Sequence, residues 1–255
     1  MQADGVRVTW LGHSTVELEL DGVRLLTDPV LRRRVAHLRR VAMAPRELAT
    51  PDAVLVSHTH YDHLDLPTLR RLLDVPRVIV PRGAGTLLRR RGFRGVVELA
   101  PGDELEVGPV AVRATEAVHG GWRPGVARDT PPLGFVVAGS ATVYFAGDTG
   151  LFPGMSSLVP ALDVALLPIG GWGPRLPEDH LDPERAAEAL ALLEPRLAIP
   201  VHWGTYRRLG LRPEPAASET PPERFRRLAA ELAPEVEVVV LEPGQSVQVA
   251  QALRA

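Results

Sequence analysis

Three histidines and one aspartate occupy four of the six positions in the stretch His58-Thr59-His60-Tyr61-Asp62-His63. The stretch directly follows residues 53–57, a short apolar run typical of a buried strand. His58 and His60 are two residues apart and therefore face the same side of an extended segment, whereas Asp62 and His63 come as the chain turns. Neutral imidazole binds zinc and similar metals, and a carboxylate adds a hard oxygen ligand. The pattern predicts two metal ions a few ångströms apart, one on two imidazoles and one on a carboxylate and an imidazole.

The competing interpretation is a solvated loop at the start of a helix. Polar clusters at strand ends usually mark functional sites, which favours the metal site. Because one cluster cannot fill two coordination spheres, further donors are expected at the ends of other strands. His119, Asp148 and His202 each follow an apolar, strand-like segment. Each alone would be interpreted as a core or capping residue, and only their repetition beside the cluster indicates a metal site.

The composition limits the classes of protein that remain. A length of 255 residues corresponds to one large domain or two small ones at roughly 100–200 residues per domain, and we predict a single domain over residues 1–255. With 45% hydrophobic and 24% charged residues, the chain is neither disordered nor collagen-like. It has no cysteine, so any metal must be held by His, Asp or Glu, and no thiol can act as a nucleophile.

Charge and hydropathy bear on partners and location. The chain has 29 basic and 31 acidic residues, which argues against a nucleic-acid partner, although the run between Arg32 and Arg40 is basic. No secretory signal is visible at the N-terminus, and no apolar run approaches the roughly 20 residues of a membrane span. These features predict a cytoplasmic protein that acts on a small-molecule substrate, and they leave its oligomeric state open.

The elements that must position the polar residues alternate between strands and helices. Strands are predicted over 6–10, 15–20, 23–26, 53–57, 77–81, 110–115, 133–138, 142–146, 164–168, 197–201, 236–241 and 246–250. Helices are predicted over 67–74, between Gly83 and Gly92, over 183–194 and over 221–232. Asp65 and Asp182 are placed to cap two of these helices. This order predicts an α/β protein with two halves of similar size.

The motif H-x-H-x-D-H at His58–His63 resembles that of the metallo-β-lactamase superfamily. Within it, the chain resembles the branch that contains L-ascorbate-6-phosphate lactonase and N-acylphosphatidylethanolamine phospholipase D. The stretches that carry this resemblance span nearly the whole chain in the order of the family: WLGHST at 10–15, LTDP at 26–29, VSHTHYDHLD at 56–65, FAGDTG at 145–150, LPIGGWGPR at 167–175, HLDPERA at 180–186 and VHWGT at 201–205.

The resemblance implies a four-layer αβ/βα sandwich with the site along one edge between its two sheets. It also implies the metal ligands. His58, His60 and His119 would hold one ion, Asp62, His63 and His202 would hold the second, and Asp148 would bridge the two.

Two divalent ions, zinc or else manganese or iron, would share a hydroxide, because metal binding lowers the pKa of water to about 7. The hydroxide would attack a carbonyl carbon or a phosphorus atom, and Asp62 would also orient it. His180 precedes the helix capped by Asp182 and would donate a proton or bind the oxyanion, unless it is a loop residue that merely contacts the helix start. His13 is predicted to hold a metal ligand through a hydrogen bond, with packing at a strand turn as the alternative.

Three residues are predicted to contact the substrate, namely Tyr61, Trp203 and Arg175. Arg175 could clasp a phosphate group, with a solvated loop charge as the alternative. Aromatic side chains more often belong to the core, which is the competing interpretation for the other two. His37, inside the basic run, is interpreted as a surface residue.

The favoured function is a dinuclear metal-dependent hydrolase that acts on a phosphodiester, a phosphate-bearing molecule or a lactone. A redox enzyme of the same fold is one alternative, either diiron or a mononuclear iron oxidoreductase. The diiron type has Glu where this chain has His60, which favours hydrolysis. A nuclease or RNA-processing member is a second alternative, which only the basic run between Arg32 and Arg40 supports. A metal-binding module without catalytic activity is the third alternative.

Overall fold

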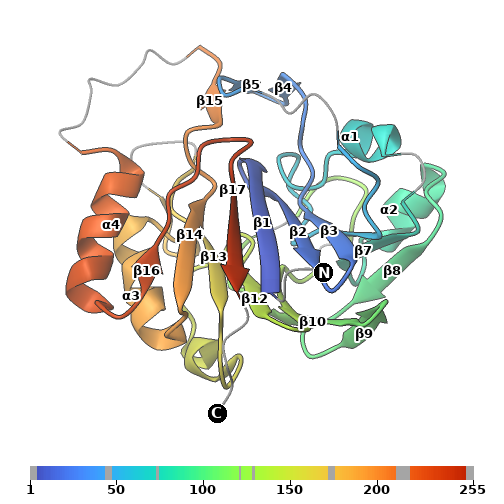
Figure 1. Ribbon diagram of the computed structural model, residues 1–255. Coiled ribbons are helices and arrows are strands. Elements are labelled where there is room, and N and C mark those ends of the chain that lie inside the picture. Colours follow the sequence, from blue (N-terminus) through green and yellow to red (C-terminus); the bar gives the residue numbers. More distant parts are fainter. Residues whose placement is uncertain are drawn as a thin grey trace.

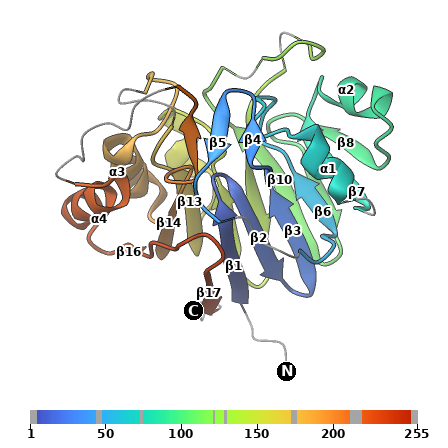
Figure 2. The ribbon, with the colours of Figure 1, turned by 90° about the horizontal axis from the view of Figure 1, so that it is seen from above.

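The protein was analysed as a computed structural model, which describes residues 5–43, 48–72, 75–120, 122–127, 130–171, 176–210 and 219–250. Its two large sheets contain seven strands each, and a third sheet contains three. Four helices and one 3₁₀ turn flank the large sheets in the described ranges (Figures 1 and 2).

The first sheet has the strand order β17-β1-β2-β3-β6-β7-β8. Its strands are β1 Gly5–Gly12, β2 Thr15–Leu20, β3 Val23–Thr27, β6 Ala53–Leu55, β7 Arg77–Pro81, β8 Val96–Leu99 and β17 Ser246–Ala250. The β17-β1-β2-β3 part is antiparallel and the β3-β6-β7-β8 part is parallel. Asp21 and Gly22 both adopt positive φ in the turn between β2 and β3, so the predicted two-residue hairpin is confirmed.

The second sheet has the order β16-β14-β13-β12-β11-β10-β9. Its strands are β9 Glu104–Val107, β10 Val110–Glu116, β11 Leu133–Ala138, β12 Thr142–Phe145, β13 Val164–Pro168, β14 Leu197–Val201 and β16 Glu237–Val238. It mixes directions in the same way, with β9 to β12 antiparallel and β12, β13, β14 and β16 parallel.

The third sheet consists of β4 Arg34–Val35, β5 Leu38–Arg40 and β15 Tyr206–Arg208, in the order β15-β5-β4. We call it the roof sheet, because it lies at the top of the molecule in Figure 1. The sequence did not predict these strands. Each is only two or three residues long, and β15 pairs with a strand more than 160 positions earlier in the chain. The hydrophobic periodicity of a few consecutive residues cannot indicate pairing with a strand so far away in the sequence.

The helices cover the outer faces of both large sheets. They are α1 Leu66–Arg71, α2 Gly85–Arg90, α3 Pro183–Leu193 and α4 Pro221–Leu232, and the 3₁₀ turn is Pro153–Ser157. Leu69 and Leu88 pack with Val54 and Val80 on the first sheet, while Leu190 and Phe225 pack in a cluster on the second. A third cluster joins the facing sides of the two sheets, with Leu18, Phe135 and Ile199 among its fully buried members.

Three apolar interfaces therefore separate four layers, and the predicted αβ/βα sandwich is confirmed. The predicted caps are also present, because Asp65 accepts from Thr68 N–H and Asp182 accepts from Arg185 N–H. The predicted strand over 236–241 is wrong in extent: only Glu237–Val238 pairs, with β14, and the chain then leaves the sheet although Leu241 remains buried. The single domain predicted over 1–255 stays a prediction.

Candidate metal centre

The carboxyl ends of six strands meet at one edge of the sandwich. In the first sheet β1, β3 and β6 run in the same direction, and they lead into His13, Asp28 and the His58–His63 turn. In the second sheet β10, β12 and β14 also run in one direction, and they lead into His119, Asp148 and His202. The chain direction alone therefore places these side chains at a common edge, where ligands bind in open α/β sheets.

One group of donors at this edge consists of His58, His60 and His119, whose ligand atoms all lie within 4.8 Å of one another. His58 Nε2 lies 3.0 Å from His60 Nδ1, and His119 Nε2 lies 3.4 Å from the same atom. His119 comes from the other sheet, so this group exists only where the two sheets face each other. We call it the three-histidine group.

A second group contains Asp62, His63 and His202, with His13 beside them. Asp62 Oδ2 is 3.2 Å from His63 Nε2 and 3.7 Å from His202 Nε2, and the two histidine nitrogens are 3.3 Å apart. We call Asp62, His63 and His202 the mixed group, because it combines one carboxylate with two imidazoles.

Asp148 lies between the two groups. Its Oδ2 is 3.1 Å from His63 Nε2 and 3.3 Å from His202 Nε2. The same oxygen is 4.0 Å from both His58 Nε2 and His119 Nε2. Its Oδ1 is buried and has no hydrogen-bond partner among the described residues. A buried carboxylate oxygen without a partner is costly unless a cation satisfies it.

The outer ring nitrogens show which tautomer each histidine adopts. His63 Nδ1 donates to Asp28 Oδ2 at 2.7 Å, and His202 Nδ1 donates to Gly170 O at 2.7 Å. His119 Nδ1 donates to Asp179 O at 2.9 Å. The inner nitrogen of each of these rings, Nε2, is therefore the one directed at the other donors.

His58 follows the same rule through a relay. Ser57 Oγ donates its proton to Asp28 Oδ2 at 2.6 Å and so accepts from His58 Nδ1 at 3.0 Å. Ring nitrogens of several imidazoles thus lie 3.0–3.4 Å apart within each group. Imidazole nitrogens that converge in this way, with their outer nitrogens fixed by other hydrogen bonds, are the donor arrangement that holds a metal ion.

Burial sets the protonation of the three-histidine group. Burial lowers the pKa of His58 well below its usual value, with neighbouring His63 adding to the effect. Burial is also the main cause that lowers the pKa of His60 and His119. All three rings are therefore neutral at neutral pH, which is the form that binds metal.

In the mixed group and at Asp148, neighbouring charges outweigh the effect of burial on the pKa. Burial alone would raise the pKa of Asp62 and of Asp148, but the neighbouring histidines outweigh it and hold both well below the usual range. Burial alone would lower the pKa of His63, but Asp148, Asp62 and Asp28 raise it well above its usual value. The carboxylates of Asp28, Asp62 and Asp148 all lie close to the His63 ring and favour a positive charge there. Without a bound cation, protonated His63 supplies that charge. The donors present therefore fit a pair of divalent cations.

His13 and Asp28 support this group from behind. Burial and the neighbouring His202 lower the pKa of His13 to about 3, so its ring is neutral and its Nε2 donates to Asp62 Oδ2 at 2.9 Å. This contact agrees with the predicted hydrogen bond to a metal ligand. Asp28 is fully buried and accepts from Ser57 N–H as well as from His63. Asp28 was not among the residues predicted from sequence to belong to the site, although it follows a predicted strand directly, as Asp148 does.

His180 is buried beside Asp148, at the start of α3, and its catalytic role stays a prediction. Its Nδ1 donates to Leu181 O at 2.9 Å, and its Nε2 lies 3.3 Å from Asp148 Oδ2. Burial would lower the pKa of His180, but Asp148 outweighs burial and raises it. The ring is held at the helix start capped by Asp182, with its Nε2 directed at the carboxylate between the two groups.

Arg123 contacts the turn that contains His58–His63 and packs against the Tyr61 ring. It is only 8% exposed, and its Nη1 donates to Leu64 O at 2.8 Å and to Thr59 O at 3.4 Å. Its guanidinium carbon lies 4.1 Å from the centre of the Tyr61 ring. Arg123 thus connects the segment after His119 to the turn that contains His58–His63, a contact that no local pattern in the sequence indicates.

The residues predicted to contact substrate are placed differently from one another. Tyr61 is 48% exposed at the rim of the site. Trp203 stacks on Trp10 with ring centres 5.1 Å apart and donates to Pro200 O, which are packing contacts. Arg175 lies outside the described residues. His37 is exposed on the turn between β4 and β5, as interpreted from the sequence.

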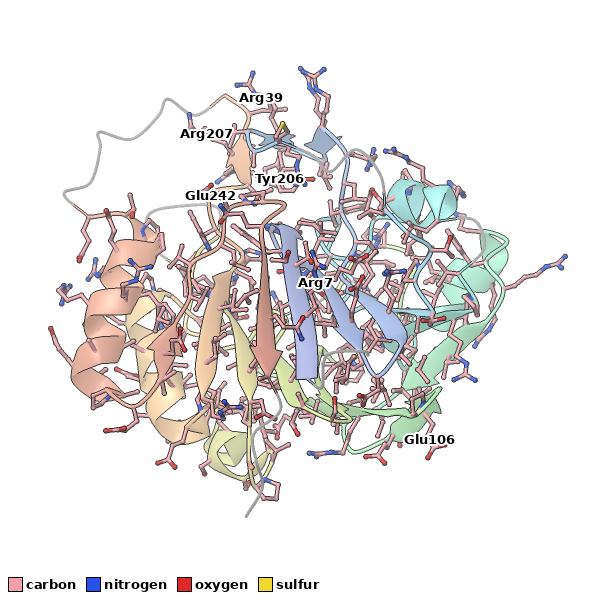
Figure 3. All side chains as sticks on the ribbon, in the orientation of Figure 1. Arg7, Arg39, Glu106, Tyr206, Arg207 and Glu242 are labelled. Atoms are coloured by element: carbon pink, nitrogen blue, oxygen red, sulfur yellow. The ribbon has the colours of Figure 1, made fainter. Side chains whose placement is uncertain are left out.

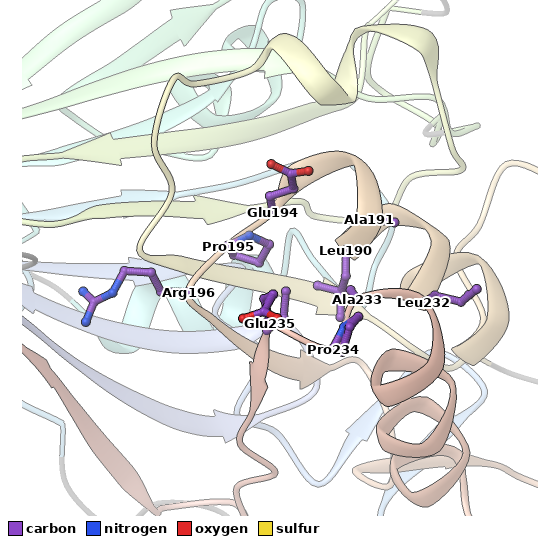
Figure 4. A pocket seen from close by; sticks show the side chains of 10 residues that line it. Leu190, Ala191, Glu194, Pro195, Arg196, Leu232, Ala233, Pro234 and Glu235 are labelled. Atoms are coloured by element: carbon purple, nitrogen blue, oxygen red, sulfur yellow. The ribbon is translucent and has the colours of Figure 1, made fainter.

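A hollow of about 470 Å³ lies at the far end of α3 and α4, between Leu190, Glu194, Arg196 and Leu232 (Figure 4). α3 begins three residues after His180 and runs away from the metal centre to this hollow. None of the histidines of the site lines it. It is therefore separate from the chemistry described above.

Two facing mixed sheets, helices on both outer faces and a histidine and aspartate site at the shared edge define the metallo-β-lactamase fold. A family model described as "Beta-lactamase superfamily domain" matches residues 23–203. A UPF0173 metal-dependent hydrolase of Methanopyrus kandleri is 37% identical over 249 residues, which cover 94% of this chain and 99% of that protein.

Two further proteins extend the comparison. The N-acyl-phosphatidylethanolamine-hydrolyzing phospholipase D 1 of Caenorhabditis elegans is 32% identical over 231 residues, which cover 79% of this chain and 65% of that protein. The solved structure of Igni18, a metallo hydrolase from Ignicoccus hospitalis, superposes with a TM-score of 0.73 at 28% identity and covers 95% of this chain and 97% of that one. The chain therefore belongs to the beta-lactamase superfamily, in the branch of the UPF0173 metal-dependent hydrolases, and it is a metal-dependent hydrolase.

Among the described helices, the longest has 12 residues, and none has the length and apolarity needed to cross a bilayer.

Proposed function

We propose that this enzyme is a dinuclear phosphodiester hydrolase. His58, His60 and His119 would hold one divalent cation, Asp62, His63 and His202 would hold the second, and Asp148 would contact both. The observation that supports this proposal is the position of Asp148, whose Oδ2 lies within 4.0 Å of inner nitrogens from both groups while its Oδ1 has no partner among the described residues.

When bound, the two cations would polarise the scissile bond and lower the pKa of a water molecule to about 7. The chain supplies the remaining functions. Asp62 is held in one orientation by His13 and can align an attacking water. His180 is fixed by Leu181 O so that Nε2 faces the centre, where it can give a proton to a leaving oxygen.

The donor chemistry favours zinc. The two groups and Asp148 together offer five imidazoles and two carboxylates. Imidazole-rich sites suit zinc, although manganese and iron accept the same donors. The two separate groups support a pair of cations over the single iron of a mononuclear oxidoreductase.

A phosphodiester is preferred to a lactone as the proposed substrate because of one similar protein. The C. elegans relative is by its name a phospholipase D that hydrolyses N-acyl-phosphatidylethanolamine, and it aligns with 79% of this chain. A phosphate-bearing small molecule and a lactone are the substrate classes against which the proposal is tested.

The test combines elemental analysis of the purified protein with assays on bis-(p-nitrophenyl) phosphate, p-nitrophenyl phosphate and a lactone panel. We expect two metal ions per chain and the highest turnover on the diester. His60→Ala should lower the diester activity by about 100-fold or more, because it removes the central nitrogen of the three-histidine group.

The matched control is His37→Ala, the same substitution at an exposed histidine of the roof sheet, which should leave turnover unchanged. One bound metal per chain, or diester activity that survives in His60→Ala, would contradict the proposal. Higher turnover on lactones than on the diester would reassign the substrate.

A further inference from the structure

The roof sheet presents a face that neither the core nor the metal centre uses. Along its strands, Val35 and Leu38 are buried, whereas Arg34, Arg39 and Arg207 are exposed. Because side chains alternate across a sheet, the exposed arginines share the outer face. Figure 3 shows Arg39 and Arg207 on this outer side, with Tyr206 nearer the body of the molecule.

The three arginines lie directly side by side. Arg39 pairs with Arg34 across one strand boundary and with Arg207 across the other. Like charges directly opposite each other in a sheet are destabilising. No ion pair found among the described residues involves any of the three. Repulsion within this arginine ladder, formed by Arg34, Arg39 and Arg207, therefore destabilises the isolated protein, and an external anion would relieve it.

Aliphatic side chains flank the ladder on the same face. Val41 and Leu209 follow Arg39 and Arg207 by two residues and are 45% and 42% exposed. The sheet-like bonds from Val41 N to Thr205 O and from Leu209 N to His37 O show that the strand register continues to both positions. Met43, two residues beyond Val41, is 77% exposed. Large aliphatic side chains on an exposed basic face need an apolar environment as well as an anion.

A groove of about 1200 Å³ continues the basic surface between the roof sheet and α1, which lie next to each other in Figures 1 and 2. Six arginines line it together with four aliphatic residues, and none of the described lining residues is acidic or aromatic. One of them, Arg40, is 8% exposed, and its Nε has no partner among the described residues. The groove thus combines arginines with aliphatic side chains, as the ladder face does.

We propose that the outer face of the roof sheet docks on an anionic lipid surface. Guanidinium groups pair with lipid phosphates, and the flanking aliphatic side chains enter the boundary between headgroups and acyl chains. A nucleic acid would satisfy the arginines, but it would leave Val41, Leu209 and Met43 exposed, and the described residues of the ladder face and the groove include no exposed aromatic ring for base stacking. The exposed aliphatic residues decide between the two polyanions.

The docking face is one layer from the metal centre. The Tyr206 ring lies edge-on to His13 at 5.3 Å, and Thr205 Oγ1 accepts from His13 N–H at 2.7 Å. Docking would hold the metal-bearing edge near the lipid surface. This inference goes beyond the proposed function, because it concerns where the enzyme works and not which bond it cleaves.

The test is co-sedimentation of the full chain with vesicles of phosphatidylcholine alone and with vesicles that also contain phosphatidylglycerol. We expect binding only to the anionic vesicles, weakened by added salt. The triple variant Arg34→Gln/Arg39→Gln/Arg207→Gln should reduce the partition coefficient on the order of 100-fold. Met43→Ser should weaken binding without changing its salt dependence, since it removes an apolar contact and no charge.

The matched control is Arg90→Gln/Arg91→Gln/Arg94→Gln, which removes the same charge from exposed positions at the end of α2 and just after it, and should bind vesicles as the unchanged protein does. The ladder variant should keep its thermal midpoint, because it removes like-charge repulsion. It should also keep its activity on the soluble diester, which separates this test from that of the proposed function.

Equal loss in both triple variants would show a nonspecific charge effect and overturn the proposal. Absence of vesicle binding would overturn it as well. Binding of a single-stranded oligonucleotide that the ladder variant alone loses, with no vesicle binding, would assign the face to nucleic acid instead.

Discussion

At the scale of single residues, the candidate metal ligands are oriented by side chains outside the two donor groups. Asp28 accepts from His63 Nδ1, from Ser57 N–H and from Ser57 Oγ–H, and the serine in turn accepts from His58. One carboxylate thereby orients one imidazole in each of the two groups. Residues in such a position usually change metal affinity by about 10–100-fold when they are substituted.

We therefore predict that Asp28→Asn weakens metal binding by about 10–100-fold, measured by competition with a chelating dye. The substitution keeps the size of the side chain but introduces an amide N–H₂ where two acceptor oxygens are needed. Asp52→Asn is the control, since Asp52 is exposed at the opposite end of β6 and accepts only from Arg24 N–H among its described hydrogen bonds. Equal affinities in both variants would show that Asp28 does not orient the ligands.

Arg123 leads to a second prediction at this scale. Arg123→Ala removes the hydrogen bonds from Arg123 to Leu64 O and Thr59 O and should lower the free energy of unfolding by about 1–3 kcal/mol, measured by urea denaturation. It should also lower kcat more than it raises KM, because the turn that Arg123 holds contains the proposed metal ligands. Arg123→Lys should restore part of the stability, since an ammonium group can still donate to one carbonyl oxygen. Full activity in Arg123→Ala would mean that the turn holds its shape without the brace.

At the scale of elements, the start of α3 positions His180. Asp182 accepts from Arg185 N–H and pairs with the Arg185 guanidinium. Asp182→Ala should cost about 1 kcal/mol, the usual value of a helix N-cap, measured as the free energy of unfolding at neutral pH. Asp182→Asn, which keeps an oxygen acceptor at the cap, should cost less than the alanine variant.

The contribution of this cap should depend on pH with a defined sign. Burial would raise the pKa of Asp182, but the hydrogen bonds from Arg185 outweigh burial and lower it below the ordinary value of 3.8. A carboxyl whose pKa is lowered on folding stabilises the protein above its unfolded pKa and loses that contribution as the pH falls through the folded pKa. The stability difference between the native protein and Asp182→Ala should therefore be constant above about pH 5 and shrink in more acidic solution.

At the scale of the whole molecule, the metal centre joins the two sheets. His58 and His63 come from the first sheet, while His119, Asp148 and His202 come from the second. Any cation held by both sides stabilises the folded state by mass action. Without a cation, the buried carboxylates at this interface are stabilised by neighbouring histidines alone.

Removal of metal with a chelator should therefore lower the thermal midpoint by about 5–10 °C, from an expected 2.7 kcal/mol of binding stabilisation at a hundredfold excess over Kd. Readdition of zinc should restore the midpoint. Asp148→Asn should show a much smaller response to the chelator, because it lacks the carboxylate between the two groups. An unchanged midpoint in the native protein would mean that the site does not contribute to the stability of the fold.

The sequence predicted the local features well, because their causes are local. Alternating apolar residues mark strands such as β2 and β10, Asp65 and Asp182 cap their helices through hydrogen bonds three residues away, and the His58–His63 turn contains its donors within six positions. The repeated position after strands, taken together with the His58–His63 cluster, also singled out His119, Asp148 and His202 as candidate donors. Cytoplasmic location and substrate contact by Tyr61, Trp203 and Arg175 stay predictions.

Only the tertiary structure decided which of these segments meet. Sheet order depends on pairing between distant strands, such as β1 with β17 and β5 with β15, and such pairing leaves no mark in a short window of sequence. The support of His63 by Asp28, the brace of Arg123 and the alignment of Arg34, Arg39 and Arg207 all arise from contacts of this kind. Residue types and their spacing determined which donors are present, whereas the packing of the two sheets decided the direction in which their lone pairs point.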